Sequence, residues 1–210
     1  LSSRSLSLRF SARHASPYAR HSSKPLLLTA SAATNSTHSS AWANSAIVTT
    51  FGPREFGPGA LAGVEFQRRL EERFFEAGGS DYSAPAQRVP DFLAGRASDG
   101  ELRSSYLLGL RPGRIDELLG EASRQILARA LRRFDRHLPG FAGPKGLLVG
   151  VESRSSGPVR VRRERETARV EGFSNLSWVG EGAGFAGGIM SAALDGVRGA
   201  QGLLRAGIRA

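Results

Sequence analysis

The segment V-G-E-G-A-G-F-A-G-G-I-M-S-A-A-L-D-G, residues 179–196, holds the residue types in this chain that are best suited to contacting a ligand. A short apolar run, residues 176–179, precedes its glycines, and small residues at helical spacing follow from about residue 189 to 204. A strand, a glycine turn and a helix in this order bring backbone N–H groups and the positive end of a helix up to a ligand. The carboxylate of Glu181, at the mouth of the turn, can accept hydrogen bonds from ribose or ribityl hydroxyls.

Glycine is needed where the backbone takes a positive φ, or where a ligand must touch the backbone directly. A tight packing turn that binds nothing would use the same residues, and the spacing alone does not decide between the two interpretations. Gly182, Gly184 and Gly187 read G-x-G-x-x-G, but no acidic residue follows about 20 positions later, so a second dinucleotide fingerprint is not indicated.

Several further blocks occur in a fixed order along the chain. They are W-A-N-S-A-I-V at residues 42–48, L-A-G-V-E-F-Q at 61–67, A-P-A-Q-R-V-P-D-F-L at 84–93, and P-G-F at 139–141 leading into G-V-E-S-R-S-S-G-P-V-R at 150–160. Together with the glycine-rich segment, these blocks resemble the C-terminal half of a poorly characterised family of FAD-dependent dehydrogenases, or NAD(P)-FAD oxidoreductases, of bacteria and plastid-bearing organisms. The resemblance covers about residues 39–206.

The resemblance implies FAD as cofactor, NAD(P)H as a possible reductant, and an unknown small molecule as substrate. It places the flavin against the following cofactor-binding residues: Gly180, Glu181, Gly182, Ala183, Gly184, Gly187, Gly188, Ile189 and Ser155.

Three residues are weak candidates for a catalytic role. Arg154 lies in a Ser/Gly/Pro loop, where an arginine is usually a solvated turn residue; the resemblance places it near the flavin, where a guanidinium can stabilise negative charge. The resemblance places Gln87 and Arg88 in the second domain, facing a cleft toward the flavin domain, although a structural role is favoured for both.

The family begins with a nucleotide-binding βαβ unit whose G-x-G-x-x-G turn holds the FAD pyrophosphate. No such turn occurs near the start of this chain. The predicted fold class is therefore α/β: an incomplete, Rossmann-like FAD-binding flavoprotein fold with an inserted α+β domain and without the N-terminal nucleotide-binding half. We expect a leader at residues 1–40, the inserted substrate or cap domain at 41–146, and the return of the FAD-binding domain at 147–210.

Residues 1–40 contain five basic residues, twelve serines and no acidic residue. This composition is typical of an organellar transit peptide, and a disordered leader explains it nearly as well. A plastid location is favoured over a mitochondrial one, with a cytoplasmic location as the remaining alternative. No apolar run reaches 18 residues, so neither a transmembrane helix nor a membrane partner is expected.

The hydrophobic periodicity predicts strands at residues 45–51, 147–151, 159–162 and 176–179, and helices at 64–77, 115–134 and from 189 onward. The strands at 147–151 and 176–179 are expected to be central parallel strands whose neighbours lie in the N-terminal half.

The composition also excludes several kinds of site. The chain has no cysteine, which rules out disulfides, thiolate metal sites and a redox-active dithiol. His137 is the one histidine outside the leader, so no metal site is expected. The arginine-rich stretch at 160–169 is interrupted by two glutamates and holds no aromatic residue, which favours a charged surface hairpin over nucleic-acid binding. The alternatives to a flavoenzyme half are a non-catalytic remnant and a basic nucleic-acid-associated protein.

Overall fold

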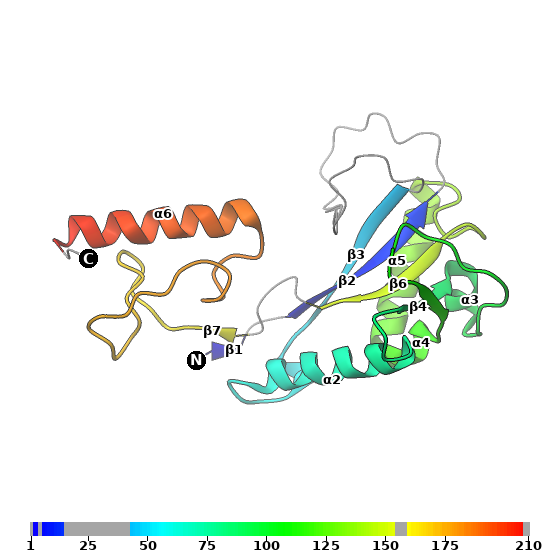
Figure 1. Cartoon of the computed structure of the whole chain (residues 1–210), viewed down its shortest axis with the longest axis horizontal. Helices are drawn as coiled ribbons and strands as arrows, with labels where there is room; N and C mark the ends of the chain where they lie inside the picture. The colour runs from blue at the N-terminus through cyan, green and yellow to red at the C-terminus, as the bar shows by residue number, and fades with distance from the viewer. Residues whose placement is uncertain (1, 4–5, 15–42, 154–158, 208–210) are drawn as a thin grey trace. The chain divides into compact units, whose positions relative to one another are not determined.

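A computed structural model describes residues 2–3, 6–14, 43–153 and 159–207 (Figure 1). The chain divides into two compact units. Unit 1 comprises Leu1–Ser7, Thr50–Arg68 and Ser153–Ala210, and unit 2 comprises Leu8–Thr49 and Arg69–Glu152. The described part has mixed α/β structure.

Unit 2 is built on a five-stranded sheet with the order β3-β2-β6-β4-β5. The strands are β2 (Leu6–His14), β3 (Ala43–Phe51), β4 (Ala84–Arg88), β5 (Leu110–Pro112) and β6 (Leu147–Glu152). Strand β6 runs antiparallel to both β2 and β4, with Val149 opposite Ser11 and Ala86, whereas β4 and β5 are parallel. The sheet is therefore mixed, and both neighbours of β6 come from this chain.

Short helices and one long helix cover the core of unit 2. They are α3 (Val89–Ala94), α4 (Ile115–Leu118) and α5 (Glu121–His137), and α3 packs on β4, α4 and α5. Helix α5 buries Leu127 and Leu131, one turn apart, because residues four positions apart share a face of a helix. These two side chains are almost fully buried, together with Phe92, Ile115 and Leu148.

Unit 1 contains β1 (Ser2–Ser3), α1 (Pro53–Phe56), β7 (Val159–Arg160) and α6 (Ile189–Arg205). Strand β1 pairs antiparallel with β7. Helix α2 (Ala62–Ala77) contributes its first seven residues to unit 1 and the rest to unit 2. Within unit 1, the ring of Phe66 lies 5.1 Å from that of Phe51 and 6.3 Å from that of Phe56, measured between centroids.

Most elements predicted from periodicity are confirmed: α2, α6, β3 and β6 lie where the patterns place them. The expected helix at 115–134 is instead two helices, α4 and α5. The helical conformation is interrupted at Gly120, whose φ of 75° lies outside the helical range.

Two expectations about strands are wrong. Residues 147–151 do form a strand, but its partners are antiparallel and belong to this chain. Residues 176–179 form no strand of the described sheets; Ser177 makes one isolated bridge to Arg169. An apolar run of four or five residues does not reveal the direction of its partners.

The expected domain bounds also differ from the observed units. Strand β6 belongs to the sheet of unit 2, although residue 147 was expected to open the FAD-binding segment. Residues 6–14, inside the expected leader, form β2 of the same sheet. The assignment of a cap role and an FAD-binding role to parts of the chain stays a prediction. Among the described residues, no helix is both long and apolar enough to span a membrane.

The core position of Leu131 yields a prediction about stability. Replacing Leu131, which is fully buried, with alanine should lower the free energy of unfolding by about 2–5 kcal/mol, because the cavity is lined by packed side chains. On the same helix, Ile126→Ala should cost less than about 1 kcal/mol, since Ile126 is 47% exposed. Urea denaturation of the full chain, followed by circular dichroism, measures both. Equal losses would show that α5 does not bury the Leu131 face.

Candidate functional site

The glycine turn, residues 180–188, is a compact loop that leads directly into α6. Gly180 and Gly184 have φ values of 75° and 77°, in the left-handed region that favours glycine. The N–H of Gly184 donates to the carbonyl of Glu181 at 2.8 Å, and the N–H of Phe185 donates to the carbonyl of Gly180 at 3.3 Å. Two of the five glycines are therefore required by the backbone of the turn itself.

Gly184 is also required by packing. A Cβ at this position would lie 2.1 Å from the carbonyl oxygen of Val159, which no side chain can tolerate. The neighbouring carbonyl of Ala183 accepts a hydrogen bond from the N–H of Val161 at 3.1 Å, so the turn is fixed against the segment that follows β7. For Gly184, the interpretation as a packing turn is sufficient.

Gly188 is different, because the fold does not require a glycine there. It is the N-cap residue of α6, its φ of −161° and ψ of 161° are extended values that any residue adopts, and it has no side chain to cap the helix. A Cβ at Gly188 would have the Oγ of Ser191 as its nearest neighbour, at 3.7 Å. A side chain at Gly188 would therefore not strain the backbone.

The N-terminus of α6 is open to solvent. Ile189, its first residue, is 90% exposed, and Gly187 and Gly188 are exposed as well. The first N–H groups of a helix have no intrahelical acceptor and carry the positive end of the helix dipole. Glu181, also exposed, stands in the same turn. The arrangement offers N–H donors and a carboxylate to a polar ligand, and Gly188 itself adds no side chain at this helix end.

The turn is tied to α6 by the carboxylate of Asp195. Its Oδ2 accepts a hydrogen bond from the N–H of Gly180 at 2.7 Å, and its Oδ1 accepts one from Nη2 of Arg163 at 2.7 Å. Nη1 of Arg163 donates to the carbonyl of Trp178 at 2.5 Å. The hydrogen bond from Arg163, assisted by that from Gly180 and opposed by partial burial, lowers the pKa of Asp195 below 3.8.

Arg163 is a buried arginine, with a side chain only 7% exposed. Its guanidinium lies 3.6 Å from the centroid of the Phe185 ring, and that of Arg160 lies 4.5 Å from the same centroid. The segment does fold back on itself, with an antiparallel bridge between Arg163 and Val170, but the expected surface position is wrong for Arg163. This arginine holds the turn and α6 together through an ion pair and a cation–π contact.

The remaining contacts of α6 depend on small residues. A Cβ at Gly199 would lie 2.7 Å from Cγ1 of Val179, and one at Gly202 would lie 1.7 Å from the carbonyl oxygen of Glu166. At these two positions α6 lies in direct contact with Val179 and with the backbone of Glu166. These contacts hold the helix in one orientation.

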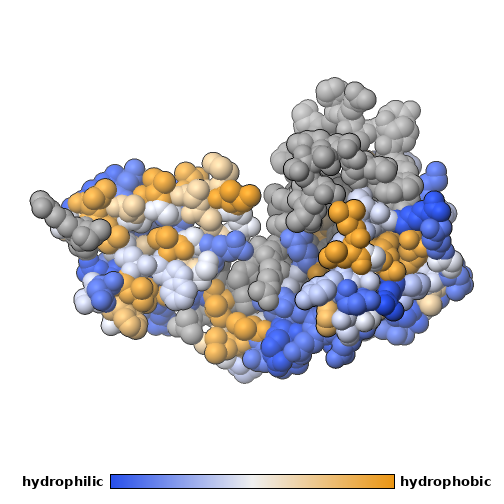
Figure 2. All heavy atoms as spheres, in the orientation of Figure 1, coloured by the Kyte–Doolittle hydropathy of each residue, from blue (hydrophilic) through white to orange (hydrophobic). Residues whose placement is uncertain are grey.

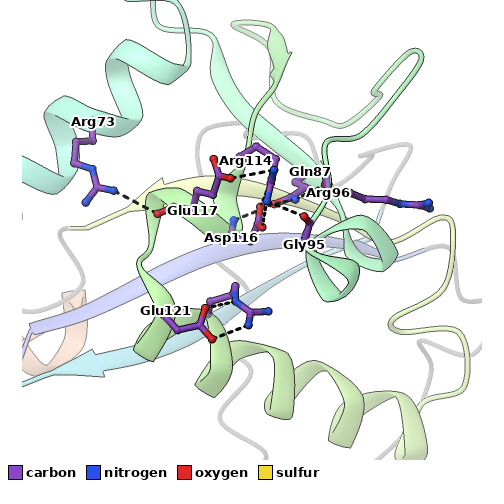
Figure 3. A network of polar contacts seen from close by, with 9 residues as sticks. Arg73, Gln87, Gly95, Arg96, Arg114, Asp116, Glu117 and Glu121 are labelled. Carbon is purple, nitrogen blue, oxygen red and sulfur yellow. Dashed lines mark hydrogen bonds and ion pairs between the residues drawn. The ribbon is translucent and has the colours of Figure 1, made fainter.

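The candidates Gln87 and Arg88 lie in unit 2, at the end of β4. Figure 3 shows Gln87 in a polar network with Asp116 and Arg114. Nε2 of Gln87 donates to the carbonyl of Arg96 at 2.8 Å and to Oδ1 of Asp116 at 2.7 Å, and its Oε1 accepts the N–H of Asp116 at 3.0 Å. Gln87 is fully buried, and both of its donors and its acceptor oxygen are used. These bonds join β4 to the N-terminus of α4.

Asp116 is the centre of this network. It is 3% exposed, and Arg114 donates to it through Nε at 2.9 Å and through Nη2 at 2.7 Å. Burial alone would raise the pKa of Asp116, but the hydrogen bonds from Arg114 and Gln87 outweigh it and hold the pKa below the usual range. Arg114 also reaches the carbonyl of Gly95 at 2.8 Å.

Arg88 makes its hydrogen bonds within the chain. Its Nη2 donates to the carbonyl of Glu101 at 2.8 Å, and its backbone N–H donates to Oγ of Ser98 at 2.7 Å. Arg154 and Ser155 lie outside the described residues. Sequence reasoning missed Asp195 and Arg163. One signal for Asp195 was that it is the single acidic residue of α6, a helix rich in small and apolar residues.

The role of Asp195 can be tested at the Gly180 amide. In Asp195→Ala, this N–H loses its acceptor, so its protection against hydrogen exchange should fall by roughly a factor of ten or more, while amides of α5 stay protected. Asp195→Asn should fall less, because an amide oxygen still accepts one bond. Site-resolved exchange by NMR measures both, and unchanged protection in Asp195→Ala would disprove the tie.

The same contact should depend on pH. Because the pKa of Asp195 is lowered in the folded state, its contribution to stability is present above the ordinary value of 3.8 and is lost as the pH falls through the lowered folded value. The protection factor of the Gly180 amide should therefore decrease in acid in the wild-type chain. In Asp195→Asn this acid-dependent step should be missing, and its persistence would assign the titration to another group.

Comparison with known proteins bears on both units. The family model "FAD-dependent protein, C-terminal domain-like" matches residues 21–155 of the 210, a range that ends before the glycine turn. A protein of Clostridium beijerinckii (strain ATCC 51743 / NCIMB 8052), described as an uncharacterized protein, is 41% identical over 159 residues. That alignment covers 74% of this chain but 30% of the relative, so the chain spans less than a third of the relative's length. The chain belongs to the family of FAD-dependent proteins, of which it carries the C-terminal domain.

Proposed function

We propose that this chain is the C-terminal part of a FAD-dependent oxidoreductase of the dehydrogenase type, in which unit 1 contributes the turn beside the flavin and unit 2 contributes the cap domain. The observation that carries this proposal is the exposed N-terminus of α6 at Gly188, where the fold leaves a glycine that it does not itself require. Family membership supports FAD as the ligand.

The residues at the turn fit a flavin. Open N–H groups at the start of a 17-residue helix suit the pyrimidine edge of the ring, where negative charge gathers on reduction. Exposed apolar groups stand at the same place: Ile189 and Met190 are 90% and 71% exposed, and Trp178, beside Gly182, is 46% exposed. Such groups match the apolar faces of a fused ring system.

When bound, FAD would supply the hydride and electron chemistry. The chain's own residues orient it: the N–H groups of α6 attract the anionic edge, and Gly188 leaves room for the ring to approach. Glu181 accepts hydrogen bonds from ribityl hydroxyls. Asp195 and Arg163 act indirectly, because they hold the turn on the helix.

In this proposal the glycine turn and α6 belong to a Rossmann-like domain whose pyrophosphate-binding half is not among the described residues. Reduction by NAD(P)H, a small-molecule substrate and a plastid location complete the proposal and stay predictions. In this proposal Gln87 and Arg88 have no catalytic role, because both side chains make hydrogen bonds within unit 2.

The proposal predicts weak binding of FAD by the 210-residue chain alone. A helix terminus and one carboxylate offset little of the cost of ordering a large ligand, so we expect a dissociation constant of about 1 mM or weaker. Saturation-transfer NMR on FAD detects binding in this range. Purification of the chain as a stoichiometric yellow protein would contradict the expectation.

A matched pair of substitutions then tests the site. Gly188→Val should abolish the saturation transfer to the flavin ring protons without loss of stability, because valine adopts the extended backbone and has room there. Gly196→Val, on the same helix but with nothing within 4 Å of its Cβ, should bind FAD like the wild type. If both variants bind equally well, the turn is not the flavin contact.

A further inference from the structure

Within unit 1, helix α6 has an exposed apolar face. This face is formed by Ile189, Met190, Leu194, Val197 and Leu204, which are 90%, 71%, 51%, 53% and 74% exposed. Figure 2 shows the apolar residues gathered along the helix. We infer that this apolar face of α6 is the docking surface for the polypeptide that makes up the rest of the FAD-dependent protein.

The opposite face of α6 is already used. Asp195 binds Arg163 and the Gly180 N–H, and positions 199 and 202 approach Val179 and Glu166 as closely as glycine permits. At 100° per residue, the apolar face lies on the other side of the helix and also includes Ala193, Ala200 and Gln201, so no charged residue falls on it. A helix that packs on one side and is apolar on the other is typical of the interior of a larger protein.

The distribution of charge on α6 argues for a polypeptide as the occupant rather than a lipid surface. A helix that lies on a membrane has a polar face rich in Lys and Arg directed to water. The side of α6 opposite the apolar face instead contacts protein, and the helix has only two basic residues, Arg198 and Arg205.

The relative identifies which polypeptide is available. The chain spans 30% of the Clostridium beijerinckii protein, which leaves about 70% of that protein without a counterpart among the aligned residues. The matching family is defined as a C-terminal domain, so a preceding segment belongs to such proteins. The apolar face begins at Ile189 and Met190, beside the proposed flavin contact at Gly188. A segment docked on it would cover the cofactor, and in this respect the inference rests on the proposed function.

Co-expression tests the inference. The 210-residue chain is produced with the N-terminal segment of the Clostridium beijerinckii protein, up to the start of the alignment, and a tag on that segment is used for purification. We expect a soluble one-to-one complex by light scattering. Leu194→Glu with Val197→Glu should weaken retention roughly tenfold or more, because two carboxylates would be buried without partners. Both positions are about half exposed in the chain alone, so the substitutions should not unfold it.

Ile126→Glu, at a position 47% exposed on α5 of unit 2, is the matched control and should leave retention unchanged. Flavin absorbance of the complex is read separately. A complex without flavin would support the docking surface and refute the proposed function. Three outcomes overturn the inference: no complex, a dimer of the chain alone that the double variant abolishes, or flotation of the chain with phosphatidylcholine–phosphatidylglycerol vesicles that the double variant abolishes.

Discussion

In each unit, a carboxylate that is largely withdrawn from water depends on an arginine. Asp116 is held by Arg114 in unit 2, and Asp195 is held by Arg163 in unit 1. A buried carboxylate without a cation is strongly destabilising, so each pair restricts the chain to arrangements that keep both partners together. The second hydrogen-bond partner of each carboxylate then sets the local geometry: Gln87 joins β4 to α4, and the Gly180 N–H joins the glycine turn to α6.

The glycines of the C-terminal segment separate into two groups once their surroundings are known. Gly184, Gly199 and Gly202 are needed because backbone or side-chain atoms occupy the space that a Cβ would take. Gly188 meets no such obstacle and has an ordinary extended backbone. A glycine-rich motif therefore combines positions that the fold needs with at least one that it does not, and only the latter is informative about a ligand.

Much of the local secondary structure could be predicted from sequence patterns. The pairing of strands and of charged residues far apart in the sequence could not. The spacing of apolar residues located α2, α5 and α6, and a short apolar run located β6. The antiparallel partners of β6 lie more than 50 residues away, and nothing in the run specifies their direction. The burial of Arg163 likewise depends on Asp195, 32 positions later, so an arginine-rich stretch gave no sign of it. No pattern in the sequence predicted β4, the strand that carries Gln87, so the hydrogen bonds that satisfy this buried side chain are known from the structure alone.

The close approaches at Gly199 and Gly202 also constrain how the length of this segment can change. An α-helix turns by about 100° per residue, so inserting one residue between Asp195 and Arg198 would shift the helical phase of everything after it. Arg198 and Gln201 would then occupy the two positions where a Cβ meets Val179 or the Glu166 backbone. A deletion would bring Ala200 and Leu203 to the same positions. A substitution on the exposed face of α6 changes one side chain. A change in length, in contrast, makes it impossible to keep the ion pair of Asp195 with Arg163 and the close contacts at positions 199 and 202 at the same time. The spacing from Asp195 to Gly202 is therefore under a stricter constraint than the identity of most residues within it.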